Sequence, residues 1–225
     1  MPNVFRNPAS MMAFIVSSLL LAPEAIAGPK NDRLQIYAGP QSVSPRDDIH
    51  VTVELADLHG NSVNNQNVNL SYTADGIPTM LEGNVQNGLV SFDVIAQQTA
   101  GKMDFIARAE GLVSNAAPVI IVAAEPAVFG LSAKPSRIPG RVDIMSEKIV
   151  DTFGNLITDQ NLVALSWVDS GGITGFENTQ LLNSRIILNR SCPENFIAPL
   201  RLRAVVKNTE VKSKDLSSLC ADGEA

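Results

Sequence analysis

The sequence predicts an all-β chain that contains two β-sandwiches in tandem. Three observations support this fold class: short apolar segments with period two, turn residues between them, and an internal repeat with an offset of 94 residues. Alternating apolar and polar residues place one face of a strand in a core and the other face in solvent. A repeat of this length corresponds to a whole domain, so we expect two copies of one sandwich.

The first half of the chain contains seven predicted strands in about a hundred residues. Within 49–55, for example, aliphatic side chains alternate with His50, Thr52 and Glu54. Gly, Asn and Asp residues mark the turns between strands. The other six predicted strands are 34–38, 68–72, 79–85, 90–96, 103–109 and 118–124. Seven short strands with this spacing are typical of an immunoglobulin-like sandwich.

The second half of the chain repeats the first. Pro45 precedes the segment 57–61 by twelve residues, and Pro139 precedes 151–155 by the same twelve. Both segments have the pattern Asp-x-x-Gly-Asn. The residues of this pattern are Asp57, Gly60 and Asn61 in the first copy and Asp151, Gly154 and Asn155 in the second. We interpret them as structural turns, because Asp accepts backbone hydrogen bonds and Gly and Asn tolerate a positive φ.

The repeat also predicts the domain boundaries. The domains are 28–125 and 126–225, and Pro126 restrains the short connection between them. The second copy is more divergent, with predicted strands at 163–167, around Ile187 and at 200–206. Its stretch 171–179 is Gly-rich and weakly patterned, and its polar tail is expected to fray after Cys220.

The N-terminus has the features of a secretory signal peptide, residues 1–27. Arg6 precedes an apolar run over 11–22, and Ala25-Ile26-Ala27 fits a small-x-small cleavage site. The run is shorter than the ~20 residues of a membrane span. Cleavage would therefore leave an exported chain with no transmembrane span, in the periplasm or on the cell surface. The alternative is an uncleaved N-terminal anchor.

Two cysteines, Cys192 and Cys220, form an even pair. In an oxidising compartment such a pair indicates one disulfide. It would close a loop of just under thirty residues. The chain-entropy relation predicts that such a bond stabilises the folded chain by roughly 3 to 4 kcal/mol. The alternative is two unrelated buried thiols.

The first copy resembles the group 1 bacterial immunoglobulin-like domains of the intimin/invasin type. The resemblance rests on the turn 57–63, the strand that begins at Val68, the segment 88–92, and Ala100-Gly101 followed by 105–109. It covers most of 40–123, and covers 135–212 more loosely. It implies the fold, but such domains serve as stalks, spacers or binding tips, so it does not specify a function.

The sequence contains no motif that predicts catalysis or a cofactor. Its two histidines, His50 and His59, are nine residues apart without Cys or His partners, which does not match a zinc site. Asp57 and Asp151 could contribute to a calcium site, but a hard cation needs six or more oxygens, so the turn interpretation is preferred. Trp167 could contact a ligand, although its phase on the predicted strand places it in the core.

These observations favour a non-catalytic exported protein that binds other envelope or surface proteins. One hypothesis is a structural or protein-binding module of the cell envelope, including an accessory part of a secretion, conjugation or pilus apparatus. A second is a surface adhesin of the invasin type, and a third is an enzyme or inhibitor with a loop-built site. A net charge of −6 and the absence of a Lys/Arg block argue against a nucleic-acid partner. No small-molecule substrate or cofactor is predicted.

Overall fold

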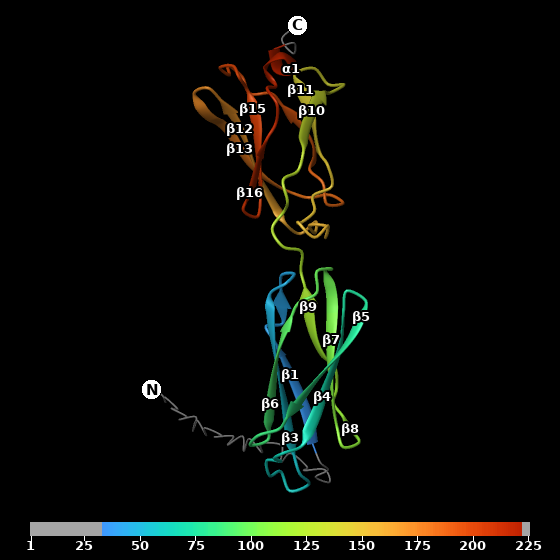
Figure 1. Ribbon diagram of the computed structural model, residues 1–225. Coiled ribbons are helices and arrows are strands. Elements are labelled where there is room, and N and C mark those ends of the chain that lie inside the picture. Colours follow the sequence, from blue (N-terminus) through green and yellow to red (C-terminus); the bar gives the residue numbers. More distant parts are fainter. Residues whose placement is uncertain (1–32, 222–225) are drawn as a thin grey trace, which may run out of the picture. The chain divides into compact units, whose positions relative to one another are not determined.

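The structure is a computed structural model that describes residues 33–221 (Figure 1). The predicted signal peptide, residues 1–27, lies outside the described residues. Strands dominate the described residues, which contain one helix, the short α1 (Ser217–Ala221). The predicted all-β class is therefore confirmed. The described residues contain no helix that is long and apolar enough to cross a membrane.

The first set of sheets is drawn in blue to green in Figure 1. One sheet has three antiparallel strands in the order β1 (Arg33–Gly39), β3 (Asp48–Ala56) and β6 (Leu89–Ile95). The facing sheet has the order β2 (Ser42–Val43), β9 (Ala117–Ile121), β7 (Gly101–Ala109), β4 (Asn67–Ala74) and β5 (Ile77–Asn84), with β8 (Leu112–Val113) paired to β7. Only the β2–β9 pair is parallel among these strand pairs.

The second set of sheets is drawn in yellow to red. A three-stranded sheet has the order β10 (Leu131–Pro135), β11 (Arg141–Ser146) and β14 (Ile187–Ser191). A four-stranded sheet has the order β13 (Gly172–Gln180), β12 (Leu162–Asp169), β15 (Arg201–Val206) and β16 (Thr209–Lys212). All of these pairs are antiparallel. The strand order of the first copy is repeated, because β11 and β15 occupy the places in their sheets that β3 and β7 occupy in the first copy.

Two separate hydrophobic cores lie between the paired sheets. The first contains the alternating side chains of β3 and β7, with Ile49 and Phe105 fully buried. The second contains the corresponding side chains of β11, β12 and β15, such as Ile144 and Leu165. In β3, β7, β12 and β15 this alternation is the one predicted from the sequence, whereas β11 was not predicted. The alternation arises because successive strand side chains point to opposite faces. Ala123 packs in the second core, three residues before Pro126.

One part of the second copy differs from expectation. The weakly patterned stretch 171–179 forms most of strand β13, at the edge of its sheet. The expected fraying after Cys220 falls on residues 222–225, which lie outside the described residues. Leu216 and Cys220 are buried in the second core, and α1 follows Leu216.

Candidate binding surfaces

The two Asp-x-x-Gly-Asn turns have the same internal hydrogen bonds. Asp57 Oδ1 accepts from the backbone N–H groups of His59 and Asn61, both at 2.8 Å. Asp151 Oδ1 accepts from Phe153 and Asn155 at 2.8 and 2.9 Å. In each turn the Asn side chain also donates to the other carboxylate oxygen.

The glycine of each turn has a positive φ. It is +82° at Gly60 and +85° at Gly154. A side chain at either position would be strained in that conformation, whatever space surrounds it. Both turns therefore combine the Asp acceptor, the Gly conformation and the Asn donor that the pattern predicts.

The surroundings of the two turns differ. Asn61 is exposed, whereas Asn155 is only 9% exposed and contacts a loop of the first copy. Asn155 Nδ2 donates to the Gln98 carbonyl at 2.7 Å, and its Oδ1 accepts from Ala100 N at 2.7 Å. The second turn thus binds another segment through a side chain that is exposed in the first turn.

Asp151 is 2% exposed and forms a further hydrogen bond, from Ala124 N to Oδ2 at 3.0 Å. Burial raises the pKa of Asp151, but hydrogen bonds from Asn155, Ala124 and Phe153 outweigh that effect and lower the pKa below its ordinary value. At Asp57 the hydrogen bonds from Asn61 are the main cause of a lowered pKa. Both carboxylates are thus held in the charged form by backbone and amide donors.

The connection at 123–126 is held by the hairpin that joins β15 and β16. Lys207 Nζ donates to the carbonyls of Ala123 and Ala124, at 2.7 and 2.9 Å. Thr209 Oγ1 donates to the Pro126 carbonyl at 2.7 Å. Several polar contacts, rather than Pro126 alone, therefore fix the backbone of this connection.

The predicted disulfide is formed. Cys192, which follows β14, bonds to Cys220 in α1, and their Cα atoms are 5.5 Å apart. Cys220 is part of the second core. The bond fastens the last described segment to the loop after β14, which is a structural role.

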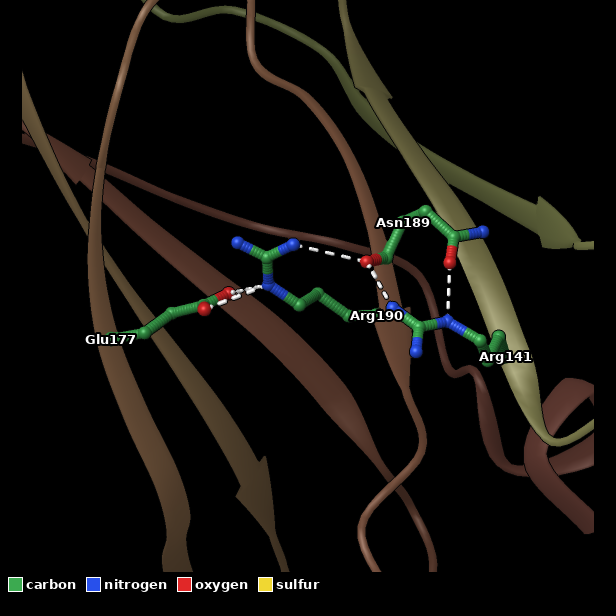
Figure 2. A network of polar contacts seen from close by, with 4 residues as sticks. All are labelled: Arg141, Glu177, Asn189 and Arg190. Atoms are coloured by element: carbon green, nitrogen blue, oxygen red, sulfur yellow. Dashed lines mark hydrogen bonds and ion pairs between the residues drawn. The ribbon is translucent and has the colours of Figure 1, made fainter.

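A polar network closes one edge of the second sandwich (Figure 2). Arg190 on β14 faces Glu177 on β13, with its Nε 2.6 Å from Oε1 and 2.7 Å from Oε2. Asn189 links this pair to Arg141, whose Nε and a terminal nitrogen donate to the Asn189 side-chain and backbone oxygens. Because β13 and β14 belong to different sheets, the network joins the two layers. The sequence did not predict it, since its members come from three strands.

The first sandwich has an open groove of about 570 Å³ over β4, β5 and β7. Tyr72, Met80 and Ile106 form apolar parts of its lining. Asp104 lies beside it with Oδ2 2.9 Å from Lys102 Nζ, and its other oxygen, Oδ1, is buried without a hydrogen-bond partner. This groove was also not predicted, because its lining comes from three separate segments.

The remaining residues singled out in the sequence have structural surroundings. His50 Nδ1 lies 2.8 Å from Asp93 Oδ1 on an exposed sheet face, and His59 Nδ1 is 4.0 Å from Asp57 Oδ2 in the turn. Trp167 is half-buried and packs against the second core, as its phase predicted. Within residues 33–221, no three His, Cys, Asp or Glu side chains form a group that could hold a metal ion.

The fold of the described residues is thus of the immunoglobulin-like β-sandwich class, with exposed sheet faces. No protein-family model and no curated protein matches the sequence. Among solved structures, the Escherichia coli adhesin FdeC aligns with a TM-score of 0.63 and 16% identity, over 82% of this chain and 64% of its own. This chain therefore spans less than two thirds of that FdeC chain.

Two Yersinia pseudotuberculosis proteins also align. InvD has a TM-score of 0.49 and 12% identity, over 81% of this chain and 69% of its own. The adhesin InvE has a TM-score of 0.38 and 16% identity, over 83% of this chain and 61% of its own. The FdeC likeness confirms, at the level of the fold, the invasin-type resemblance predicted from the sequence.

Proposed function

We propose that this chain is an exported, non-catalytic adhesive protein of the bacterial surface. The observation that carries the proposal is the fold likeness to FdeC, which is described as an Escherichia coli adhesin. The likeness favours the adhesin hypothesis over an accessory role in a secretion, conjugation or pilus apparatus, for which we find no supporting observation. We further propose that the two hydrophobic cores correspond to two domains, close to the predicted division at 125/126.

The exposed edges of the sheets support a binding role. Strand β5 ends its sheet and exposes Ile77 and Met80 at 68% and 67%. Its counterpart β13 ends the second sheet and exposes Ile173 and Phe176 at 61% and 65%. Edge strands with apolar side chains can pair with or pack against a partner protein. Large apolar side chains thus recur at the same place in both copies.

Adhesion by purified protein is the direct test. Latex beads coated with the chain should attach to epithelial cells or extracellular matrix more than beads coated with a protein of similar size and net charge. Protease treatment of intact native cells should also remove the protein if it is displayed on the surface. A chain that resists protease until the outer membrane is opened, and whose beads do not attach, would contradict the proposal.

A further inference from the structure

The outer face of the sheet β13-β12-β15-β16 gathers basic side chains in an otherwise acidic chain. Residues 201–215 contain five Lys or Arg and two Asp or Glu, a net charge of +3. The whole chain carries −6, so the rest of it carries −9. Arg201 and Arg203 alternate with the buried Leu202, which places both on the face directed away from the core.

The strand register places an aromatic ring in line with these charges. Phe176 pairs with Ser166, Ser166 with Arg203, and Arg203 with Lys212, so one row crosses all four strands on the same face. Phe176 lies at one end of this row. Lys212 lies at the other, with its side chain 53% exposed. Ser166 between them is small and buried, so no side chain projects from the sheet in the middle of the row.

The neighbouring row forms a shallow hollow. Asn178, Ala164 and Val205 are paired across three strands and line a cavity of about 370 Å³, together with Leu162 and Lys207. Ala164 leaves space because its side chain is small. The hollow therefore offers an apolar floor and an amide at one side, whereas the Lys207 ammonium group at its end already donates to the carbonyls of Ala123 and Ala124.

Two carboxylates partly neutralise this face. Glu210 Oε2 lies 2.6 Å from an Arg203 terminal nitrogen, and its Oε1 lies 3.3 Å from Lys212 Nζ. Asp215 accepts hydrogen bonds from Leu200 N and from Ser217. With these two acids counted, three positive charges of this segment remain unbalanced.

We propose that this face binds an acidic polysaccharide. A guanidinium forms paired hydrogen bonds with a carboxylate or sulfate, and ammonium groups add charge attraction. An exposed aromatic ring suits the apolar face of a sugar, and an amide can both donate to and accept from hydroxyls. A peptide strand could add only at the β13 or β16 edge, beside this face and not on it, because the backbone groups of β12 and β15 are paired on both sides within the sheet. The chemistry therefore favours a glycan over an acidic peptide.

Binding to immobilised heparin, a sulfated polysaccharide, tests the proposal with the full chain. Changing Arg201, Lys212 and Lys214 to Gln should weaken binding about tenfold, since three exposed ionic contacts with the polyanion are lost. A control that changes Lys134, Arg137 and Lys148 to Gln removes the same charge elsewhere and should bind like the wild type. Salt should weaken wild-type binding. Equal loss in both triple variants, or no binding by the wild type, would overturn the proposal.

Phe176→Ala and two other polyanions separate the glycan from other partners. The 65% exposed ring is removed without disturbing the core, so the variant should fold normally yet bind heparin more weakly. Binding of poly-glutamate or duplex DNA as tight as that of heparin, with no effect of Phe176→Ala, would indicate a general polyanion surface and overturn the glycan assignment.

This inference names a partner class for the adhesive role proposed above and partly rests on it, but the two can fail separately. If coated beads attach to cells and the basic-face triple variant attaches equally well, the adhesive role is supported and the polysaccharide site is contradicted. If heparin binding depends on the basic face but beads do not attach to cells, the polysaccharide site is supported and the adhesive role is contradicted.

Discussion

At the scale of single residues, Asp151 shows how burial changes the role of a repeated motif. Its carboxylate accepts from Phe153, Asn155 and Ala124, in a site that is almost closed to solvent. Asp57 has the same turn bonds at the surface. A buried acceptor that loses its partners costs about 1–3 kcal/mol, whereas exposed groups can bond to water instead. The second turn should therefore contribute more to stability than the first.

We predict that Asp151→Asn lowers the free energy of unfolding by about 1–3 kcal/mol near pH 7, because the new amide places a donor among N–H donors. Asp57→Asn serves as the matched control and should cost less. Urea unfolding followed by circular dichroism measures both. Equal losses at the two positions would contradict the stabilising role of the buried turn.

The same residue predicts a pH dependence. The pKa of Asp151 is lowered below 3.8 in the folded chain, so its contribution to stability is complete above about pH 5 and is lost as pH falls through the unfolded and then the folded pKa. Wild-type stability should fall between pH 5 and pH 2, and Asp151→Asn should fall less steeply over that interval. Parallel curves for the two proteins would show that Asp151 is not the group responsible.

The sequence predicted the turn itself but not its surroundings. Asp, Gly and Asn at fixed spacing determine the local hydrogen bonds, and these are the same in both copies. Burial of Asn155 depends on the loop at Gln98 and Ala100, which lies 55 to 57 residues earlier in the chain. Contacts between such distant segments depend on packing, so no local sequence pattern predicts them.

At the scale of secondary structure elements, strand β13 explains why one stretch could not be assigned. Its inward positions include Gly175 and Glu177, and Glu177 pairs with Arg190 instead of filling the core. Its large apolar side chain, Phe176, points outward. The apolar side chain of β13 is therefore on the solvent face, whereas β3 and β7 bury apolar side chains at every second position and were predicted from that pattern. The basic face was missed for a related reason, because Arg201, Arg203 and Lys212 come together only through strand pairing.

The disulfide and α1 form a second element whose contribution can be measured. Changing both cysteines to Ser should lower the free energy of unfolding by roughly 3 to 4 kcal/mol, because the bond closes a loop with a sequence separation of 28. Urea unfolding of the oxidised wild type and the double variant gives the difference. Wild type treated with reductant should unfold at the same midpoint as the double variant. A difference below about 1 kcal/mol would mean that the segment from Leu216 to Cys220 is held by packing alone.

At the scale of the whole molecule, two cores with different side chains raise the question of how independently they unfold. The first contains Phe105 and the second contains Leu165, each almost fully buried. Asn155 connects the two halves by donating to the Gln98 carbonyl and accepting from the Ala100 N–H. A few polar bonds provide much less coupling than a shared apolar core, which supports the proposed division into two domains.

Trp167 allows a direct test, because it is the single tryptophan of the chain and packs against the second core. Phe105→Ala should destabilise the first core by about 3–5 kcal/mol. If the cores unfold independently, the Trp167 fluorescence transition in urea should stay at its wild-type midpoint, while circular dichroism shows an earlier transition. Leu165→Ala is the reciprocal control. It should lower the Trp167 midpoint, because the free energy of unfolding that this fluorescence reports should fall by about 2–5 kcal/mol. A Trp167 midpoint that shifts fully with Phe105→Ala would show one cooperative unit, and adding Asn155→Ala would then show whether the hydrogen bonds at Gln98 and Ala100 transmit that cooperativity.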